Sequence, residues 1–391
     1  NSVGFFPTEG WSEHVKVYVR SKPRVYVNTE VKPNTNRVSI TPEIYSPMPF
    51  MWVPQSGGHI LKINTKTLAV TGTYKGSPTA EAGTSPSRTT VAADGSVWAG
   101  LRSGSFTAGG RVVKIGLSEV AGQCIDRNND GVIQTSTGGG DDGTGAYQAD
   151  VKAWAGRKYT STDGYGSSFA PGDEPEDECI LLYVRVYASG VRGVAIDTKG
   201  FVWAGGAGNS KITKIHPDTG AIVGAFALSR TYGIGFSPNG IMWVSARWDG
   251  KFIAYLPSDI SPQPDMGSGA TTIGSSNSHS SGPSLSFKKR SYACSNCYGL
   301  TIDQGGSAWY ARWSDGQVHR VDGITMALDS NSYRDEMQSP AFGSNQYSTH
   351  RYAGMCTDAH GDIWINNRAS SGGGCVIVLS WKSGPRADNG G

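Results

Sequence analysis

A nine-residue segment near the middle of the chain carries oxygen-bearing side chains at the spacing of a calcium-binding loop. Asp126, Asn128 and Asp130 alternate with other residues, Gly131 takes the sixth position, and Val132 offers a backbone carbonyl at the seventh. Calcium prefers six to eight oxygen ligands, and this spacing wraps such ligands around one point. The segment therefore predicts a structural calcium ion. The alternative is a solvated turn rich in Asn and Asp.

The twelfth position of this loop is Thr137, so a carboxylate from elsewhere must complete the ligand shell. An acidic run at residues 173–178 directly precedes Cys179. A disulfide between Cys124 and Cys179 would bring that run to the loop. The predicted metal ligands are Asp126, Asn128, Asp130, Val132, Asp177 and Glu178.

The six cysteines favour structural disulfides, since their number is even and the chain has the composition of a secreted or cell-surface protein. Cys124–Cys179 and Cys356–Cys375 are the expected pairs, although spacing alone does not fix the connectivity. Cys294 and Cys297 have the CxxC spacing of zinc and redox sites, but no second ligand pair follows them at a suitable spacing. We therefore expect this pair to form a disulfide as well.

Arginines recur three or four residues after regularly spaced tryptophans, and aromatic residues accompany them. Guanidinium groups bind carboxylate or sulfate, and aromatic faces stack on sugar rings. The predicted ligand-binding residues are Arg102, Arg192, Arg247, Arg312, Arg368, Trp248, Trp313 and Tyr232, with Arg88, Tyr298, Arg351 and Tyr352 expected on the same face. They predict a surface for an acidic glycan or a carboxylate-bearing protein. The alternative is a packing device in which guanidinium groups stack between repeated sheets.

One short cluster could support catalysis by elimination. His350, Arg351 and Tyr352 are consecutive, and Tyr298 is expected beside them. Arginine could neutralise a carboxylate while Tyr or His abstracts a proton. Neither the GxSxG nor the HExxH motif occurs. A non-catalytic extracellular module for binding or surface assembly is therefore the expected function, with a polysaccharide or streptogramin-type lyase as the alternative.

Composition favours an all-β protein and excludes two classes of partner. The 391 residues include 54 glycines, and no stretch shows sustained helical periodicity, so many short strands joined by tight turns are expected. The net charge is only +3, which is not typical of nucleic-acid binding. No apolar run is long enough to span a membrane as a helix.

A repeated pattern explains where these residues should lie. An apolar strand leads into a turn whose Gly stands three residues before a Trp, and that Trp opens the next strand. The copies end at Trp98, Trp203, Trp243, Trp309 and Trp364, with a degenerate copy at Trp52. Short oxygen-bearing side chains stand six residues before four of the tryptophans, at Asp197, Ser237, Asp303 and Asp358. This is the chemistry of β-hairpin turns, and the tryptophans are expected to pack between repeats.

Each unit continues with strands such as KITKIH and GAIVGAFAL, which gives four strands in about 40 residues, the size of a β-propeller blade. We expect residues 1–391 to form one propeller of six blades, or seven if an insertion at about 118–187 hides another. A Gly/Ser-rich loop is expected at about 266–284. The N-terminal segment HVKVYVR or RVYVN should supply the missing last strand and close the ring.

The repeat resembles the NHL and streptogramin-lyase group of propellers, whose blades share a Gly-x-[Val/Ile]-Trp core followed by a Lys-Ile type strand. The resemblance covers most of residues 50–380. It implies the fold. It also implies a lyase site of histidine, glutamate and magnesium in that group, but His216, His319 and His360 stand at different positions of their repeats. The resemblance is therefore carried by residues of the scaffold.

Overall fold

The computed structural model describes residues 27–32, 37–42, 48–55, 57–81, 85–102, 109–138, 150–156, 165–167, 169, 172–279, 282–313, 316–329, 352–358, 361–368 and 374–379. Contacts divide the chain into Asn1–Met48 and Pro49–Gly391. In the first unit, β1 (Val27–Lys32) pairs with β2 (Arg37–Pro42) as an antiparallel hairpin. The segment HVKVYVR lies outside the described residues, and only the last two residues of RVYVN are described, where they begin β1 and pair with β2. Ring closure by an N-terminal strand therefore stays a prediction.

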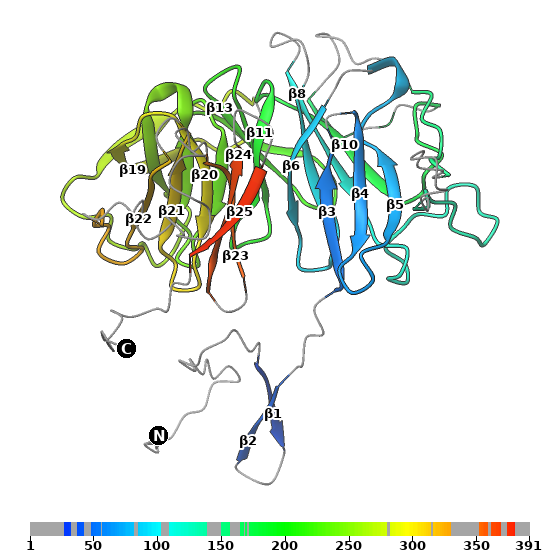
Figure 1. Cartoon of the computed structure of the whole chain (residues 1–391), viewed down its shortest axis with the longest axis horizontal. Coiled ribbons are helices and arrows are strands. Elements are labelled where there is room, and N and C mark those ends of the chain that lie inside the picture. The colour runs from blue at the N-terminus through cyan, green and yellow to red at the C-terminus, as the bar shows by residue number, and fades with distance from the viewer. Residues whose placement is uncertain are drawn as a thin grey trace. The chain divides into compact units, whose positions relative to one another are not determined.

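The second unit is built from small antiparallel sheets, which confirms the all-β prediction (Figure 1). We number the sheets in chain order. Sheet 1 contains β3 (Phe50–Pro54), β4 (His59–Asn64) and β5 (Val70–Lys75). Sheet 2 contains β6 (Ser85–Val91), β7 (Val97–Arg102), β8 (Gly110–Ile115), β10 (Ile180–Val186) and, at its edge, β9 (Gly166–Ser167). The predicted insertion at about 118–187 follows β8, but its last part is β10, the fourth strand of sheet 2, so the inserted segment is shorter than predicted.

Sheet 3 contains β11 (Val191–Ile196), β12 (Val202–Gly206), β13 (Lys211–Ile215) and β14 (Ile222–Ala227). Sheet 4 contains β15 (Gly233–Phe236), β16 (Met242–Ala246), β17 (Lys251–Pro257), β19 (Leu285–Ala293) and the edge strand β18 (Thr271–Ser275). The segment expected to be a Gly/Ser-rich loop therefore holds a strand. In the part of the chain that the structure describes, the loops contain two short 3-10 helices, η1 (Thr79–Glu81) and η2 (Arg247–Asp249).

Sheet 5 contains β20 (Cys297–Ile302), β21 (Ala308–Arg312) and β22 (Val318–Val321), and sheet 6 contains β23 (Tyr352–Thr357), β24 (Ile363–Arg368) and β25 (Gly374–Leu379). The strands β6, β11, β15, β20 and β23, each the first of its sheet, contact one another in that order. This serial packing of meandering sheets is propeller-like.

The turn before each repeated Trp has the predicted conformation. The five glycines three residues before Trp have φ between 84° and 88°, which residues other than glycine rarely adopt. Asp197 shows what the residue six positions before Trp does, because Oδ1 accepts hydrogen bonds from the backbone of Lys199 and Phe201. Its Oδ2 accepts one from Trp203 Nε1 at 2.8 Å, a contact that the turn pattern did not predict.

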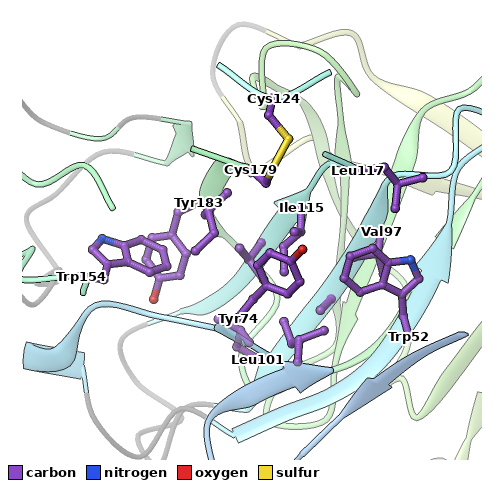
Figure 2. Packing of buried hydrophobic residues seen from close by; sticks show 14 residues of the cluster. Trp52, Tyr74, Val97, Leu101, Ile115, Leu117, Cys124, Trp154, Cys179 and Tyr183 are labelled. Atoms are coloured by element: carbon purple, nitrogen blue, oxygen red, sulfur yellow. A yellow bond between two sulfur atoms is a disulfide. The ribbon is translucent and has the colours of Figure 1, made fainter. Parts of the chain in front are cut away.

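Five of the six repeated tryptophans are buried between sheets, as predicted. Trp98, Trp203, Trp243 and Trp309 are fully buried, and Trp52 is 6% exposed. Figure 2 shows the cluster between sheets 1 and 2, where Trp52 faces Val97, with the Cys124–Cys179 bond at its margin. Trp364 differs, since 40% of it is exposed. No sheet follows sheet 6 among the described residues to cover it.

Disulfides join Cys124 to Cys179, as predicted, and Cys294 to Cys297. The predicted Cys356–Cys375 bond is wrong, because Cys356 is a free, exposed thiol. Strand β24 lies between the two strands that carry these cysteines, with Cys356 opposite Trp364 and Cys375 opposite Asn367. Two strand spacings already exceed the Cα separation of about 7 Å that a disulfide tolerates.

Candidate anion-binding site

Three arginines from different sheets converge on one tyrosine. Arg88 belongs to β6, Arg192 to β11 and Arg247 to η2, while Tyr232 stands just before β15. Their guanidinium carbons lie 5.5, 4.9 and 5.5 Å from the centre of the Tyr232 ring. The first strands of successive sheets lie side by side, so the loops entering them place residues from distant parts of the sequence together.

Aromatic rings surround the guanidinium group of Arg247. Its Cζ atom lies 5.2 to 5.6 Å from the centres of the Tyr232, Trp248, Tyr298 and Trp313 rings. Tyr298 stacks on Trp313 with 4.6 Å between ring centres, and Tyr232 packs against Tyr298 at 4.1 Å. Rings on its faces stabilise a guanidinium by cation–π attraction and leave the N–H donors at its edge available to a ligand.

Two hydrogen bonds fix the centre of this group. Arg192 Nη1 donates to the Tyr232 hydroxyl at 2.8 Å, and that hydroxyl donates to the hydroxyl of Tyr298 at 2.7 Å. Arg88 Nη2 approaches the carbonyl oxygen of Tyr298 at 3.4 Å. Arg102, the last residue of β7, lies close enough to Arg192 for its charge to add to the effect of burial in lowering the pKa of Arg192. We call Arg88, Arg102, Arg192, Arg247, Tyr232, Tyr298, Trp248 and Trp313 the arginine–aromatic site.

The four arginines of this site have no carboxylate partner among the described residues, where the ion pairs involve other basic groups. Arg102 Nε is buried and has no hydrogen-bond partner there. Each guanidinium carries five N–H donors, and buried donors without acceptors are costly. The site is therefore rich in donors and positive charge and poor in acceptors.

Electrostatics within the site agree with this description. Burial lowers the pKa of Arg88 and of Arg192, and neighbouring guanidinium groups lower both further. Arginine nevertheless keeps its charge at neutral pH because its ordinary pKa is so high. Burial, followed by the hydrogen bond with Tyr298, raises the pKa of Tyr232. The Tyr232 phenol consequently acts as a neutral hydrogen-bonding group near pH 7.

The other predicted site residues have different partners or lie outside the described residues. Arg312 donates to Gln317 Oε1 at 2.8 Å within its own hairpin. Tyr352 is 2% exposed and packs in the cluster around Trp309, so it forms part of the core. His350, Arg351 and the Arg368 side chain lie outside the described residues, and the catalytic cluster that they suggested stays a prediction.

The predicted calcium loop is held in a compact turn. Asn129 and Gly131 have φ of 57° and 84°. Asp126 Oδ2 accepts a hydrogen bond from the Gly131 N–H at 2.9 Å, whereas its Oδ1 atom is buried without a partner. Among the described residues no three His, Cys, Asp or Glu side chains gather closely enough to hold a metal ion by themselves. Any ion here would also need the oxygens of Asn128 and the Val132 carbonyl.

Asp177 and Glu178 lie beside this loop, where their carboxylates accept hydrogen bonds from backbone N–H groups. Glu178 accepts hydrogen bonds from the N–H groups of Arg127 at 2.7 Å and Gln134 at 2.8 Å, so one carboxylate clamps both ends of the loop. Asp177 accepts from Thr135, Ser136 and Cys179. The acidic run is thus beside the loop, as the disulfide argument predicts, and the same hollow is lined by Asp126, Asn128, Glu174, Glu176 and Glu178.

Comparisons with known proteins show structural likeness without close relatives. No family model and no curated protein matches the chain. Virginiamycin B lyase from Staphylococcus aureus is 15% identical, with a TM-score of 0.37 over 74% of this chain and 69% of that one. A streptogramin B lyase is 11% identical, with a TM-score of 0.45 over 88% and 84%.

A third solved structure is similar to the same degree. The β-propeller domain of Cps50 (Swd1) from Myceliophteria thermophila is 10% identical, with a TM-score of 0.41 over 86% of this chain and 93% of that one. Such likenesses concern the fold alone. The serial packing of its small antiparallel sheets is what makes this chain an all-β protein with a propeller-like fold. Its disulfides are typical of an oxidising compartment, and no helix of the described residues is long and apolar enough to cross a membrane.

Proposed function

We propose that this protein is an extracellular binding module whose arginine–aromatic site binds an acidic glycan. The observation that carries the proposal is the convergence of four arginines that have no carboxylate partner among the described residues. Carboxylate or sulfate groups would supply the missing acceptors and neutralise the charge. Trp248 lies next to Tyr232, 5.1 Å between ring centres, and is 47% exposed, so a sugar ring could stack on it.

Calorimetry with oligogalacturonate tests this proposal. Arg247→Ala and Arg192→Ala should each weaken binding roughly tenfold to a hundredfold, since a hydrogen bond to a charged group contributes about 1.5 to 3 kcal/mol. Lys288→Ala is the matched control, because Lys288 is exposed on β19 and its loss removes the same charge. Equal affinity for the methyl-esterified oligomer, or equal weakening by the control variant, would contradict the site.

The same titration separates the two functional classes. A binding module leaves the oligomer intact. A lyase would release unsaturated uronates, which ultraviolet absorbance detects.

Binding of a carboxylate ligand should be constant through neutral pH and fall in acid as the ligand is protonated. The raised pKa of Tyr232 places its loss of a proton above the ordinary value near 10, so the phenol should contribute at all lower pH values and lose its effect only in strong alkali.

We further propose that calcium stabilises the loop at residues 126–134. Support comes from the buried, unpartnered Asp126 Oδ1 atom and from the ordered turn that Glu178 clamps. Removal of calcium with EGTA should lower Tm, and added calcium should restore it. Asp130→Asn should abolish this difference, while Asp218→Asn, a change in an exposed turn of sheet 3, should leave it unchanged. If EGTA leaves the Tm of the unaltered protein unchanged, the loop is a turn that calcium does not stabilise.

A further inference from the structure

Two hydroxyl groups at the centre of the arginine–aromatic site belong to a hydrogen-bond chain that runs in one direction. A guanidinium group can only donate, so Arg192 Nη1 donates to the oxygen of Tyr232. The hydrogen of Tyr232 then goes to the hydroxyl oxygen of Tyr298, 2.7 Å away. Burial and, after it, this hydrogen bond raise the pKa of Tyr232, which is the direction expected for a phenol that donates. The chain therefore leads from a cation to the hydroxyl of Tyr298.

The hydroxyl of Tyr298 stands at the end of this chain. A phenol carries one hydrogen, and because the oxygen of Tyr298 accepts from Tyr232, its own hydrogen has to point to a further acceptor. Among the described residues the Tyr298 hydroxyl has no second partner, since Arg88 and Ser245 donate to its backbone carbonyl instead. Tyr298 is half-buried. Its hydrogen can therefore reach water in the free protein and a ligand oxygen in a complex.

The surrounding structure fixes the position of Tyr298. The residue directly follows Cys297, which is buried in a disulfide with Cys294. Its carbonyl oxygen accepts a hydrogen bond from Ser245 Oγ at 3.2 Å, and its ring stacks on Trp313 with 4.6 Å between ring centres. These contacts come from sheets 4 and 5. The donor is thus held in place before a ligand arrives, which lowers the entropy cost of binding.

We propose that Tyr298 determines the specificity of the arginine–aromatic site by donating its hydroxyl hydrogen to an anionic oxygen of the bound glycan. This inference rests on the proposed function and assigns one contact within it. Arg192 cannot accept a hydrogen bond, so the direction of the chain cannot reverse, and Tyr298 presents a donor to the ligand. A carboxylate or sulfate oxygen is the matching acceptor, because hydrogen bonds to ionised groups are roughly twice as strong as those between neutral groups.

Replacement by phenylalanine separates this role from a structural one. Tyr298→Phe keeps the ring that packs beside Arg247 and Trp313 and removes only the hydroxyl. Affinity for the acidic oligomer should fall roughly tenfold to a hundredfold, as expected for the loss of one hydrogen bond to a charged group. Tyr292→Phe is the matched control, because the Tyr292 hydroxyl donates to the Met326 carbonyl at 2.8 Å within the core. This control should leave the affinity unchanged.

Calorimetry with oligogalacturonate and with a sulfated galactan oligomer distinguishes the two anions. The oligomer that binds the unaltered protein more tightly supplies the anion, and Tyr298→Phe should weaken that complex. If Arg247→Ala weakens the complex and Tyr298→Phe leaves it unchanged, the role of Tyr298 is wrong while the proposed function stands. If neither oligomer binds the unaltered protein, the proposed function is contradicted, and the role of Tyr298 with it.

NMR spectroscopy gives a readout that a structural role would not change. Protein isotopically labelled at the Cζ atom of tyrosine gives a separate signal for each phenol, and the signal missing from Tyr298→Phe identifies that residue. This signal should shift when the tighter-binding oligomer is added, because Cζ carries the hydroxyl that forms the new bond. The signal of Tyr292 should stay in place. A Tyr298 signal that does not respond to saturating oligomer would overturn the proposal.

Discussion

A hydrogen bond between the indole and an oxygen six residues earlier recurs in sheets 3 to 6, and in sheet 4 the acceptor is the Ser237 hydroxyl, 3.4 Å from Trp243 Nε1. Asp197 accepts from Trp203, Asp303 from Trp309 and Asp358 from Trp364, at 2.8 to 2.9 Å. In sheet 3 a cation completes the group, because Lys214 Nζ lies 5.1 Å from the Trp203 ring centre and 3.7 Å from the Asp197 carboxylate. The Asp197 carboxylate thus accepts hydrogen bonds from the turn backbone and from the indole, and it also pairs with the lysine ammonium group.

Sheet 2 lacks this oxygen, which leads to a prediction. Ala92 stands six residues before Trp98, and Trp98 Nε1 is buried without a hydrogen-bond partner. Lys114 Nζ lies 5.8 Å from the Trp98 ring centre, where Lys214 lies in sheet 3. Ala92→Asp should therefore raise the free energy of unfolding by about 1 kcal/mol, the net contribution of one hydrogen bond. Urea denaturation measures this. Ala92→Asn is the uncharged control, and a lower stability for both variants would contradict the reasoning.

The sequence predicted much of the arginine–aromatic site because its residues follow the repeat. Arg192, Arg247, Tyr232 and Tyr298 lie together as expected. Arg312 occupies a corresponding position but turns to Gln317, since a local amide acceptor competes for its donors. The chain of hydroxyl contacts from Arg192 through Tyr232 to Tyr298 could not be predicted, because it depends on side-chain directions that spacing does not determine.

Individual elements show where local patterns are sufficient and where they are not. The turn glycines and the strands around each Trp follow from short-range chemistry and were predicted. The pairing of Cys356 was wrong because even cysteine numbers say nothing about strand order. Strand β18 was missed because its sequence is polar and Gly/Ser-rich. Its pairing with β19 supplies the hydrogen bonds that its composition does not suggest.

The insertion in sheet 2 depends on its disulfide. Cys124 and Cys179 are separated by 55 residues, so their bond restricts a long loop in the unfolded chain. Replacing both by alanine should lower the free energy of unfolding by roughly 4 kcal/mol on the loop-entropy relation. Chemical denaturation of the variant measures the loss. The variant lacking Cys294 and Cys297, which are 3 residues apart, should lose less, and an equal loss would show that loop length does not govern the effect.

At the scale of the whole molecule, the sheets interact mainly with their neighbours. Trp98 belongs to a cluster that joins sheets 2 and 3, whereas Trp309 belongs to one that joins sheets 5 and 6. The two clusters share no residue. The structure in this respect resembles repeat proteins, whose stability is approximately a sum of nearest-neighbour contacts.

Substitutions in separate clusters should therefore be additive. Trp98→Phe and Trp309→Phe should each lower the free energy of unfolding, and the double variant should lose their sum within about 0.5 kcal/mol. Denaturation of the four proteins completes the cycle. A pair within one cluster, Trp309→Phe with Ile363→Val, serves as the comparison and should deviate from additivity. A large coupling energy between Trp98→Phe and Trp309→Phe would mean that distant sheets do not contribute independently to stability.

The direction of packing also has a consequence for synthesis. Because each of the first five repeated tryptophans is covered by the sheet that follows it, a growing chain can bury one indole whenever the ribosome releases one more sheet. The nascent protein would then expose a single leading indole at every stage instead of a series of them. Folding from the N-terminus onward would thus limit the exposed apolar surface that chaperones must cover to about the area of one sheet.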